Sequence, residues 1–162
     1  MHDARRDRRP RPPAQHRGPQ KRGAEQAIGS SRGGLTTKIH AVVDALGNPV
    51  AIALTAGQVS DFSQALPLLA QVAPRAVIAD KAYDGDAVIT ALAERGIVPV
   101  IPSKANRRIA RDTDFALYRE RNLVERFFNK LKGFRAIATR YDKLASTFLA
   151  AVYLVSAVIW LN

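Results

Sequence analysis

The sequence predicts an α/β domain built on a mixed β-sheet, and three observations support this fold class. Two runs rich in β-branched residues flank the turn Leu46-Gly47-Asn48-Pro49, which is typical of an antiparallel hairpin. Short apolar runs then alternate with segments of helical period, a pattern typical of parallel strands joined by helices. The length of 162 residues suits one domain with a single sizeable core.

Each element has a local reason. Asp84 and Asp86 are placed to cap a helix that Gly96 closes, and Pro99 in the strand after it indicates a sheet edge. Pro67 interrupts the shorter helix before them. The predicted order is strands at 36–43 and 50–55, a short helix from Ser60 or Asp61 to 72, a strand at 76–79, a helix from 84–86 to 95, a strand at 97–101, a polar loop at 103–115, and helices at 116–134 and 143–160.

Residues 1–34 differ from the rest of the chain. They hold nine Lys or Arg, three acids and four prolines, with almost nothing apolar, so they predict a disordered basic arm that contacts phosphates non-specifically. The net charge of 25 − 14 = +11 predicts a polyanionic partner, nucleic acid first and an acidic membrane second. The lack of cysteine excludes a disulfide scaffold and thiolate metal sites, and it fits a reducing compartment.

Asp80 is the first candidate for chemistry, because it ends the most buried-looking strand, where α/β sheets collect ligands. The alternative is a capping or turn role, but Asp84 and Asp86 lie closer to the following helix and leave Asp80 without that role. Two other residues are better explained by structure. Asp44 precedes a Gly-Asn turn, and His40 lies in mid-strand as a partly buried histidine.

The helix from Ala116 carries polar residues spaced by 3, 4 and 7, which lie within about 60° of arc on one face. An apolar stripe lies beside them, so the polar groups point along the edge of the core. The alternative is an ordinary solvated face linked by one i, i+4 ion pair. The polar residues are Tyr118, Arg121, Glu125 and Lys132; the apolar ones are Leu117, Val124, Phe128 and Leu131.

These residue types suit phosphoryl transfer on DNA. Asp80 and Glu125 can hold Mg²⁺ or Mn²⁺ through oxygen ligands, and two such ions about 3.5–4 Å apart activate the attacking oxygen and stabilise the leaving one. Arg121 and Lys132 can bind the phosphates beside the scissile bond. Such a site normally has a third carboxylate on the adjoining strand.

The run Tyr118-x-x-Arg121-x-x-x-Glu125-x-x-x-x-x-x-Lys132 matches the Y-R-E-K signature of bacterial insertion-sequence DDE transposases. Stretches 31–40, 44–49, 79–84 and 135–143 are similar to the same family, in the family's order. The resemblance covers roughly residues 20–162. It implies the C-terminal catalytic portion of such an enzyme, an RNase H-like fold, divalent-metal catalysis, and joining of cut or nicked transposon ends to target DNA.

The resemblance also implies a role for each matching residue. Asp80 becomes the second catalytic acid and Glu125 the third, both as metal ligands, and Tyr118, Arg121 and Lys132 face DNA. It implies double-stranded DNA as partner, both transposon ends and target, together with a second copy or the upstream part of the transposase. The expected location is the bacterial cytoplasm, in association with the nucleoid.

The chain departs from the family before Ser31. There the family has a strand that carries the first acid, in a segment resembling Asp-(Ala or Ser)-Thr-x-Val-Arg-Ala-His. This chain instead has mostly Arg and Pro at 5–13, and no apolar strand surrounds Asp3 or Asp7. We expect residues 35–162 to form a partial RNase H-like domain without its first strand and first acid. One permitted codon choice for residues 5–13, read one base later, gives Asp-Ala-Thr-Val-Val-Arg-Ala-His. We therefore hypothesise that the arm is out-of-frame translation of that strand.

Three functions follow from these features. The first is a DNA transposase with metal-dependent strand cleavage and transfer, and the second is an inactive truncated remnant that only binds DNA. The third is a tail-anchored membrane protein, since residues 145–161 carry no charge. That segment is short and alanine-rich and carries Ser and Thr, so it equally suits a helix packed on a sheet and buried nearly all round. The family resemblance runs through this segment and favours the buried helix, and Trp160, Phe127 and Phe128 are expected in the core.

Overall fold

The computed structural model describes residues 26–31 and 34–161, and the α/β class is confirmed. The described strands form two separate sheets instead of the one mixed sheet predicted, because no described strand links them. The first sheet is antiparallel and contains β1 (Gly29–Ser31), β2 (Gly34–Val43) and β3 (Pro49–Ala56). The second sheet is parallel and contains β4 (Ala76–Ile78) and β5 (Val98–Val100).

The predicted hairpin is confirmed. β2 pairs with β3 from Thr37 opposite Ala56 to Val43 opposite Pro49, with a register shift at the turn end. Asp44 makes the turn, because one of its carboxylate oxygens accepts hydrogen bonds from the amides of Leu46 and Asn48, both at 2.9 Å. Its assignment to turn formation is therefore also confirmed.

The short strand β1 is the element that the sequence did not predict. It pairs antiparallel with the first three residues of β2, so the expected lack of regular structure before Leu35 is wrong at Gly29–Ser31. Three small polar residues carry neither alternation nor apolar content, which explains why the pattern was missed. The expectations for residues 1–25, including the out-of-frame hypothesis, fall outside the described residues.

Arg140 fixes the residues just before this strand, and β2, to the other end of the chain. Its guanidinium donates to the Gln26 carbonyl at 2.7 Å, bonds the Thr37 hydroxyl and lies 4.9 Å from the centre of the Phe148 ring. Burial is the main influence on this group and lowers the pKa of Arg140. Arg140 therefore links the segment before β2 to the last helix of the chain through contacts of its guanidinium.

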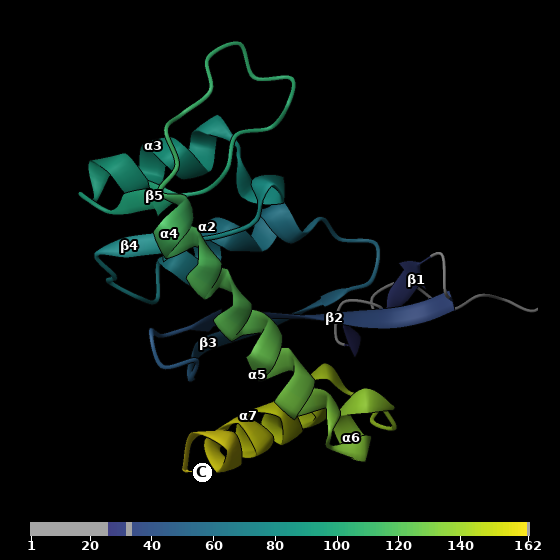
Figure 1. Ribbon diagram of the computed structural model, residues 1–162. Helices are drawn as coiled ribbons and strands as arrows, with labels where there is room; N and C mark the ends of the chain where they lie inside the picture. The colour runs from purple at the N-terminus through teal and green to yellow at the C-terminus, as the bar shows by residue number, and fades with distance from the viewer. Residues whose placement is uncertain (1–25, 32–33, 162) are drawn as a thin grey trace, which may run out of the picture.

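The helices follow the predicted order with two differences. The helix expected at 116–134 is divided into α4 (Phe115–Tyr118), the 3₁₀ turn η3 (Arg119–Arg121) and α5 (Asn122–Lys132), which together run as one rod (Figure 1). The short α6 (Arg135–Ala138) was not predicted. The others are η1 (Asp61–Gln64), α2 (Ala65–Leu69), η2 (Lys81–Tyr83), α3 (Asp86–Glu94) and α7 (Ala145–Leu161).

The apolar residues form two clusters where the sequence predicted one core. One cluster packs α5, α6 and α7 on the antiparallel sheet, and the other packs α2 and α3 around β5. The rod of α4 and α5 runs from the half with β4 and β5 to the half with α7 (Figure 1). The first cluster contains Ile52, Phe127, Leu131, Ile137, Phe148, Val152 and Ile159; the second contains Ala65, Leu69, Val88, Leu92, Ile97 and Ile101.

Helix α7 is buried on one face only, so the expectation of burial nearly all round is wrong. Phe148 and Val152 lie in the first cluster, whereas Leu154 is 69% exposed and Trp160 is 59% exposed. Trp160 therefore lies outside the core, while Phe127 is buried as predicted. Of the helices described here, none has the length and apolar content needed to cross a bilayer.

Candidate functional site

Asp80 and Glu125 contact the same guanidinium, although they lie on elements far apart in the sequence. Arg121 Nη2 lies 2.6 Å from Glu125 Oε1, and Arg121 Nη1 lies 3.6 Å from Asp80 Oδ2. The two carboxylate side chains are half exposed, at 50% and 51%. The structure thus brings together three of the five residues singled out in the sequence, at the solvent-exposed surface.

The position of Asp80 follows from a local capping contact. Its Oδ1 accepts a hydrogen bond of 2.8 Å from the Lys81 amide and so caps the turn η2, while Oδ2 is turned to Arg121. The sequence argument that left Asp80 without a capping role is therefore wrong. Asp84 does not cap α3, where the N-cap residue is Gly85 without a side-chain cap.

Tyr118 borders this cluster, and Lys132 lies apart from it. The Arg121 guanidinium lies 5.9 Å from the centre of the Tyr118 ring, which packs edge-to-face on Phe115. Lys132 ends α5, seven residues after Glu125 and therefore about 10 Å further along the helix axis. Its side chain is exposed, and the contacts described for this chain do not link it to either carboxylate.

The carboxylates of Asp80 and Glu125 provide part of the ligand set that a hard divalent cation needs. Mg²⁺ in proteins commonly takes one or two carboxylates and completes its shell with water and substrate phosphates, which Asp80 and Glu125 allow. Among the described residues, no group of three or more Asp, Glu, His or Cys side chains is close enough to hold a metal. The described strands carry no acid, so the third carboxylate expected on an adjoining strand is not among them.

Cationic side chains surround Asp80 on its other side. A hollow of about 350 Å³ is lined by Asp80, Lys81, Ala82, Lys104 and Ala105. Both lysines are exposed. A phosphate that enters this hollow meets two ammonium groups beside the carboxylate, which is an arrangement that suits a nucleic-acid backbone.

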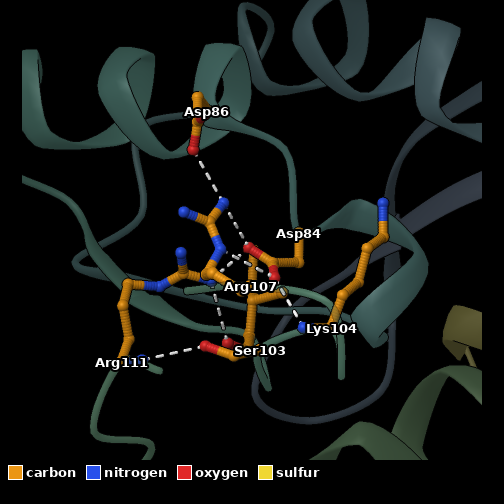
Figure 2. A network of polar contacts seen from close by, with 7 residues as sticks. Asp84, Asp86, Ser103, Lys104, Arg107 and Arg111 are labelled. Atoms are coloured by element: carbon orange, nitrogen blue, oxygen red, sulfur yellow. Dashed lines mark hydrogen bonds and ion pairs between the residues drawn. The ribbon is translucent and has the colours of Figure 1, made fainter. Parts of the chain in front are cut away.

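A buried carboxylate holds the loop that carries Lys104 (Figure 2). Asp84 accepts hydrogen bonds from the Lys104 amide at 2.7 Å, from Arg107 Nε at 3.1 Å and from Arg111 Nη2 at 2.6 Å. Arg107 also reaches Asp86, and the Arg111 amide donates to the Ser103 hydroxyl. Together these contacts fix the basic loop after β5 beside η2 and the Asp80 hollow.

The charge of Asp84 is set by opposing effects. Burial raises the pKa of Asp84, but the hydrogen bonds from Arg107, the Lys104 amide and Arg111 outweigh it, so the pKa lies well below its usual range. Sequence reasoning missed this network, because the three partners lie 20 to 27 residues after Asp84. A basic loop rich in arginine gives no signal that distinguishes this pairing from solvated charge.

A larger groove of about 1000 Å³ lies between the two sheets. Residues 38–45 line one side, residues 74–80 line another, and Arg121 and Phe128 of the long helical rod also border it. His40 faces this region and is buried, with Nε2 2.7 Å from the Thr55 hydroxyl oxygen. Burial is the main influence and lowers the pKa of His40, so its expected structural role is confirmed.

Comparison with known proteins gives a family match over nearly the whole chain, with residues 2–160 matching the family described as Transposase DDE domain. A putative transposase for insertion sequence element IS6501 from Brucella ovis is 42% identical over 130 residues, which is 79% of this chain and all of the relative. A putative transposase for insertion sequence element IS402 from Burkholderia cepacia is 36% identical over 121 residues, which is 67% of this chain and 55% of the relative. No solved structure matches.

Proposed function

The chain belongs to the DDE transposases of insertion sequences, and from this premise we propose that it acts in metal-dependent cleavage and transfer of DNA strands. The observation that carries the proposal is the convergence of Asp80 and Glu125 on Arg121. Residues 35–162 would then form the catalytic portion, with an RNase H-like fold whose first strand and first acid are absent from the described residues. The chain spans about half the length of the IS402 relative. The activity of a whole transposase is therefore part of what we propose.

In this proposal Asp80 and Glu125 hold Mg²⁺ or Mn²⁺. When bound, such ions activate the attacking oxygen and stabilise the leaving oxygen of the phosphodiester. Arg121 neutralises the carboxylates before DNA arrives, and its planar guanidinium then suits bidentate binding of a phosphate. Tyr118 supports that guanidinium with its ring, and Lys132 contacts the backbone further along the duplex.

The test is nicking of terminal-repeat DNA in the presence of Mg²⁺ or Mn²⁺. We expect Glu125→Gln to reduce cleavage more than about 100-fold, because groups that only support a metal ligand are already worth about 10- to 100-fold. The matched control is Glu94→Gln, an exposed acid on α3 with no described partner near the site, which should cleave like the unaltered chain. Equal cleavage by both variants would remove Glu125 from the proposed chemistry.

A second candidate function is DNA binding without cleavage. The net charge of +11 and the lack of a third carboxylate at the described site favour it. Such a chain binds transposon ends and target DNA with an affinity that falls steeply with salt, and it leaves the DNA intact at every concentration of Mg²⁺ or Mn²⁺. Either function places the chain with the nucleoid, with a second copy or an upstream transposase segment as its protein partner.

A further inference from the structure

The basic loop after β5 carries more positive charge than its folding uses. Residues 103–111 contain four Lys or Arg, and two of these, Arg107 and Arg111, are ion-paired with the buried Asp84. Lys104 is exposed, and among the residues that the structure describes no contact of its ammonium group is found. A cation that the fold leaves unneutralised is available to an anionic partner.

The main chain of Lys104 is held at both of its polar groups. Its amide donates to Asp84 Oδ2 at 2.7 Å, and its carbonyl accepts a hydrogen bond of 3.0 Å from the Arg107 amide. The Ser103 hydroxyl, next to it, accepts from the Arg111 amide at 2.9 Å. Figure 2 shows the Lys104 side chain running away from this network. The ammonium group therefore extends from a backbone that is already ordered, which lowers the entropy cost of binding.

A second lysine reaches the same place from another segment. Lys81 lies in η2, which the Asp80 carboxylate caps, and it lines the hollow of about 350 Å³ together with Asp80 and Lys104. The Asp80 carboxylate already has the Arg121 guanidinium 3.6 Å away. Two ammonium groups thus surround one carboxylate that is partly neutralised, so an anion that enters the hollow meets net positive charge.

We propose that Lys81 and Lys104 together hold one phosphate of the DNA strand beside the acid pair of Asp80 and Glu125, and that Asp84 positions Lys104 for this contact. The inference rests on the proposed function, which makes DNA the ligand. Lysine binds phosphate as a point charge, and backbone contacts of this kind fix the register of a duplex without reading its sequence. The contact therefore sets which phosphodiester bond lies at the two carboxylates.

The experiment is a phosphate scan of terminal-repeat duplex DNA in EDTA, where affinity is measured without cleavage. A neutral methylphosphonate replaces one phosphate at a time around the transposon end, and fluorescence anisotropy gives the affinity of the full chain. We expect one replacement to lower the affinity about tenfold, because it removes a charge-assisted contact. That position should lie within about two nucleotides of the transposon end, since phosphates of one strand follow at about 3.4 Å along the duplex axis.

The double variant Lys81→Ala, Lys104→Ala tests which residues hold that phosphate. Both side chains are exposed, so the variant should fold. The same methylphosphonate should lower its affinity by less than about twofold, because the partner charges are already gone. The slope of log affinity against log salt should fall by about 1, as for one phosphate, and a fall of about 2 would contradict a shared phosphate.

Lys143→Ala is the matched control. This exposed lysine lies between α6 and α7, in the other half of the molecule, and its removal should leave the tenfold effect in place. Asp84→Asn keeps both lysines and is measured at a temperature where it is folded. It should reduce the effect of that methylphosphonate to less than about threefold, whereas Asp86→Asn should retain it. A role of Asp84 in stability alone would leave the effect intact in the folded variant.

The inference is overturned if no phosphate near the transposon end couples to the two lysines, or if Lys143→Ala loses the effect as well. Full retention of the effect in Asp84→Asn overturns the positioning role. Cleavage by Glu125→Gln is measured separately with metal. Loss of cleavage without coupling at the lysines contradicts this inference alone, and coupling with undiminished cleavage contradicts the proposed role of the acid pair alone.

Discussion

Asp84 is the residue on which the position of the basic loop depends. A buried carboxylate is costly unless its hydrogen-bonding capacity is filled, and Asp84 fills it with two guanidinium groups and one main-chain amide. The loop then presents Lys104 at the hollow that Asp80 lines. Arg107 and Arg111 thus serve the fold, although in the sequence they look like the solvated cations of a polar basic loop.

We expect Asp84→Asn to lower the free energy of unfolding by about 2–4 kcal/mol, because the arginines and the Lys104 amide lose a charged acceptor. The control is Asp86→Asn, whose side chain is 87% exposed and which should change stability by less than about 1 kcal/mol. Urea unfolding measures both values. Equal losses in the two variants would contradict the structural role assigned to Asp84.

The ionisation of Asp84 also predicts how the stability of the folded chain depends on pH. Its folded-state pKa lies well below that of the unfolded chain, so the unfolded state binds more protons as pH falls. The stability that Asp84 provides is therefore complete above about pH 4 and is lost progressively below it. Melting temperatures between pH 2.5 and 6 should fall less steeply for Asp84→Asn than for the unaltered chain, and parallel curves would count against this assignment.

At the scale of elements, the rod of α4, η3 and α5 carries the site. The 3₁₀ turn tightens the helix at Arg119–Arg121, yet Arg121 and Glu125 still meet as an i, i+4 pair. Phe127 and Leu131, each 1% exposed, fix the rod to the antiparallel sheet. Burial on one face of α5 therefore determines where Glu125 points on the other.

We expect Phe127→Ala to lower the free energy of unfolding by about 3–5 kcal/mol, because it removes a fully buried ring from the first cluster. The control is Phe115→Ala on α4, where the ring is 64% exposed and the change should stay below about 1 kcal/mol. Denaturant unfolding followed by circular dichroism distinguishes them. Similar values for the two rings would show that α5 is not held by its packing.

At the scale of the whole molecule, the fold consists of two halves with separate cores around a groove. The antiparallel sheet with α5, α6 and α7 forms one half, and α2, α3 and the parallel sheet form the other (Figure 1). Small cores stabilise weakly, and regions with few shared contacts open independently. The rod of α4 and α5 is the element that runs through both halves.

This division predicts that a core substitution acts on its own half. Leu92→Ala, in the second cluster, should speed amide exchange in α2, α3 and β5 more than tenfold while β2 and β3 change by less than about twofold. Uniform acceleration across both halves would show that the molecule unfolds as one unit.

The sequence by itself determined most of the elements and singled out the candidate site residues, because both depend on local patterns. The Asp44 turn, the hairpin and the helix that carries Arg121 and Glu125 follow from period, caps and turn residues within a few positions. The same local patterns singled out Asp80. They could not show β1, which is too short and polar to have a period, or the exposed face of α7, where Trp160 looked like a core residue.

Tertiary structure alone decided how distant segments meet. Asp80, just after β4, reaches Arg121 on the helical rod, and Asp84 is paired with arginines of a loop more than 20 residues later. The separation of β2 and β4 into different sheets likewise has no signal in the sequence. The residue pattern of a strand does not show which strands pair with its two edges. Hydrogen bonds on a strand's second edge and ion pairs over long sequence distances depend on the packed chain, and no local pattern encodes them.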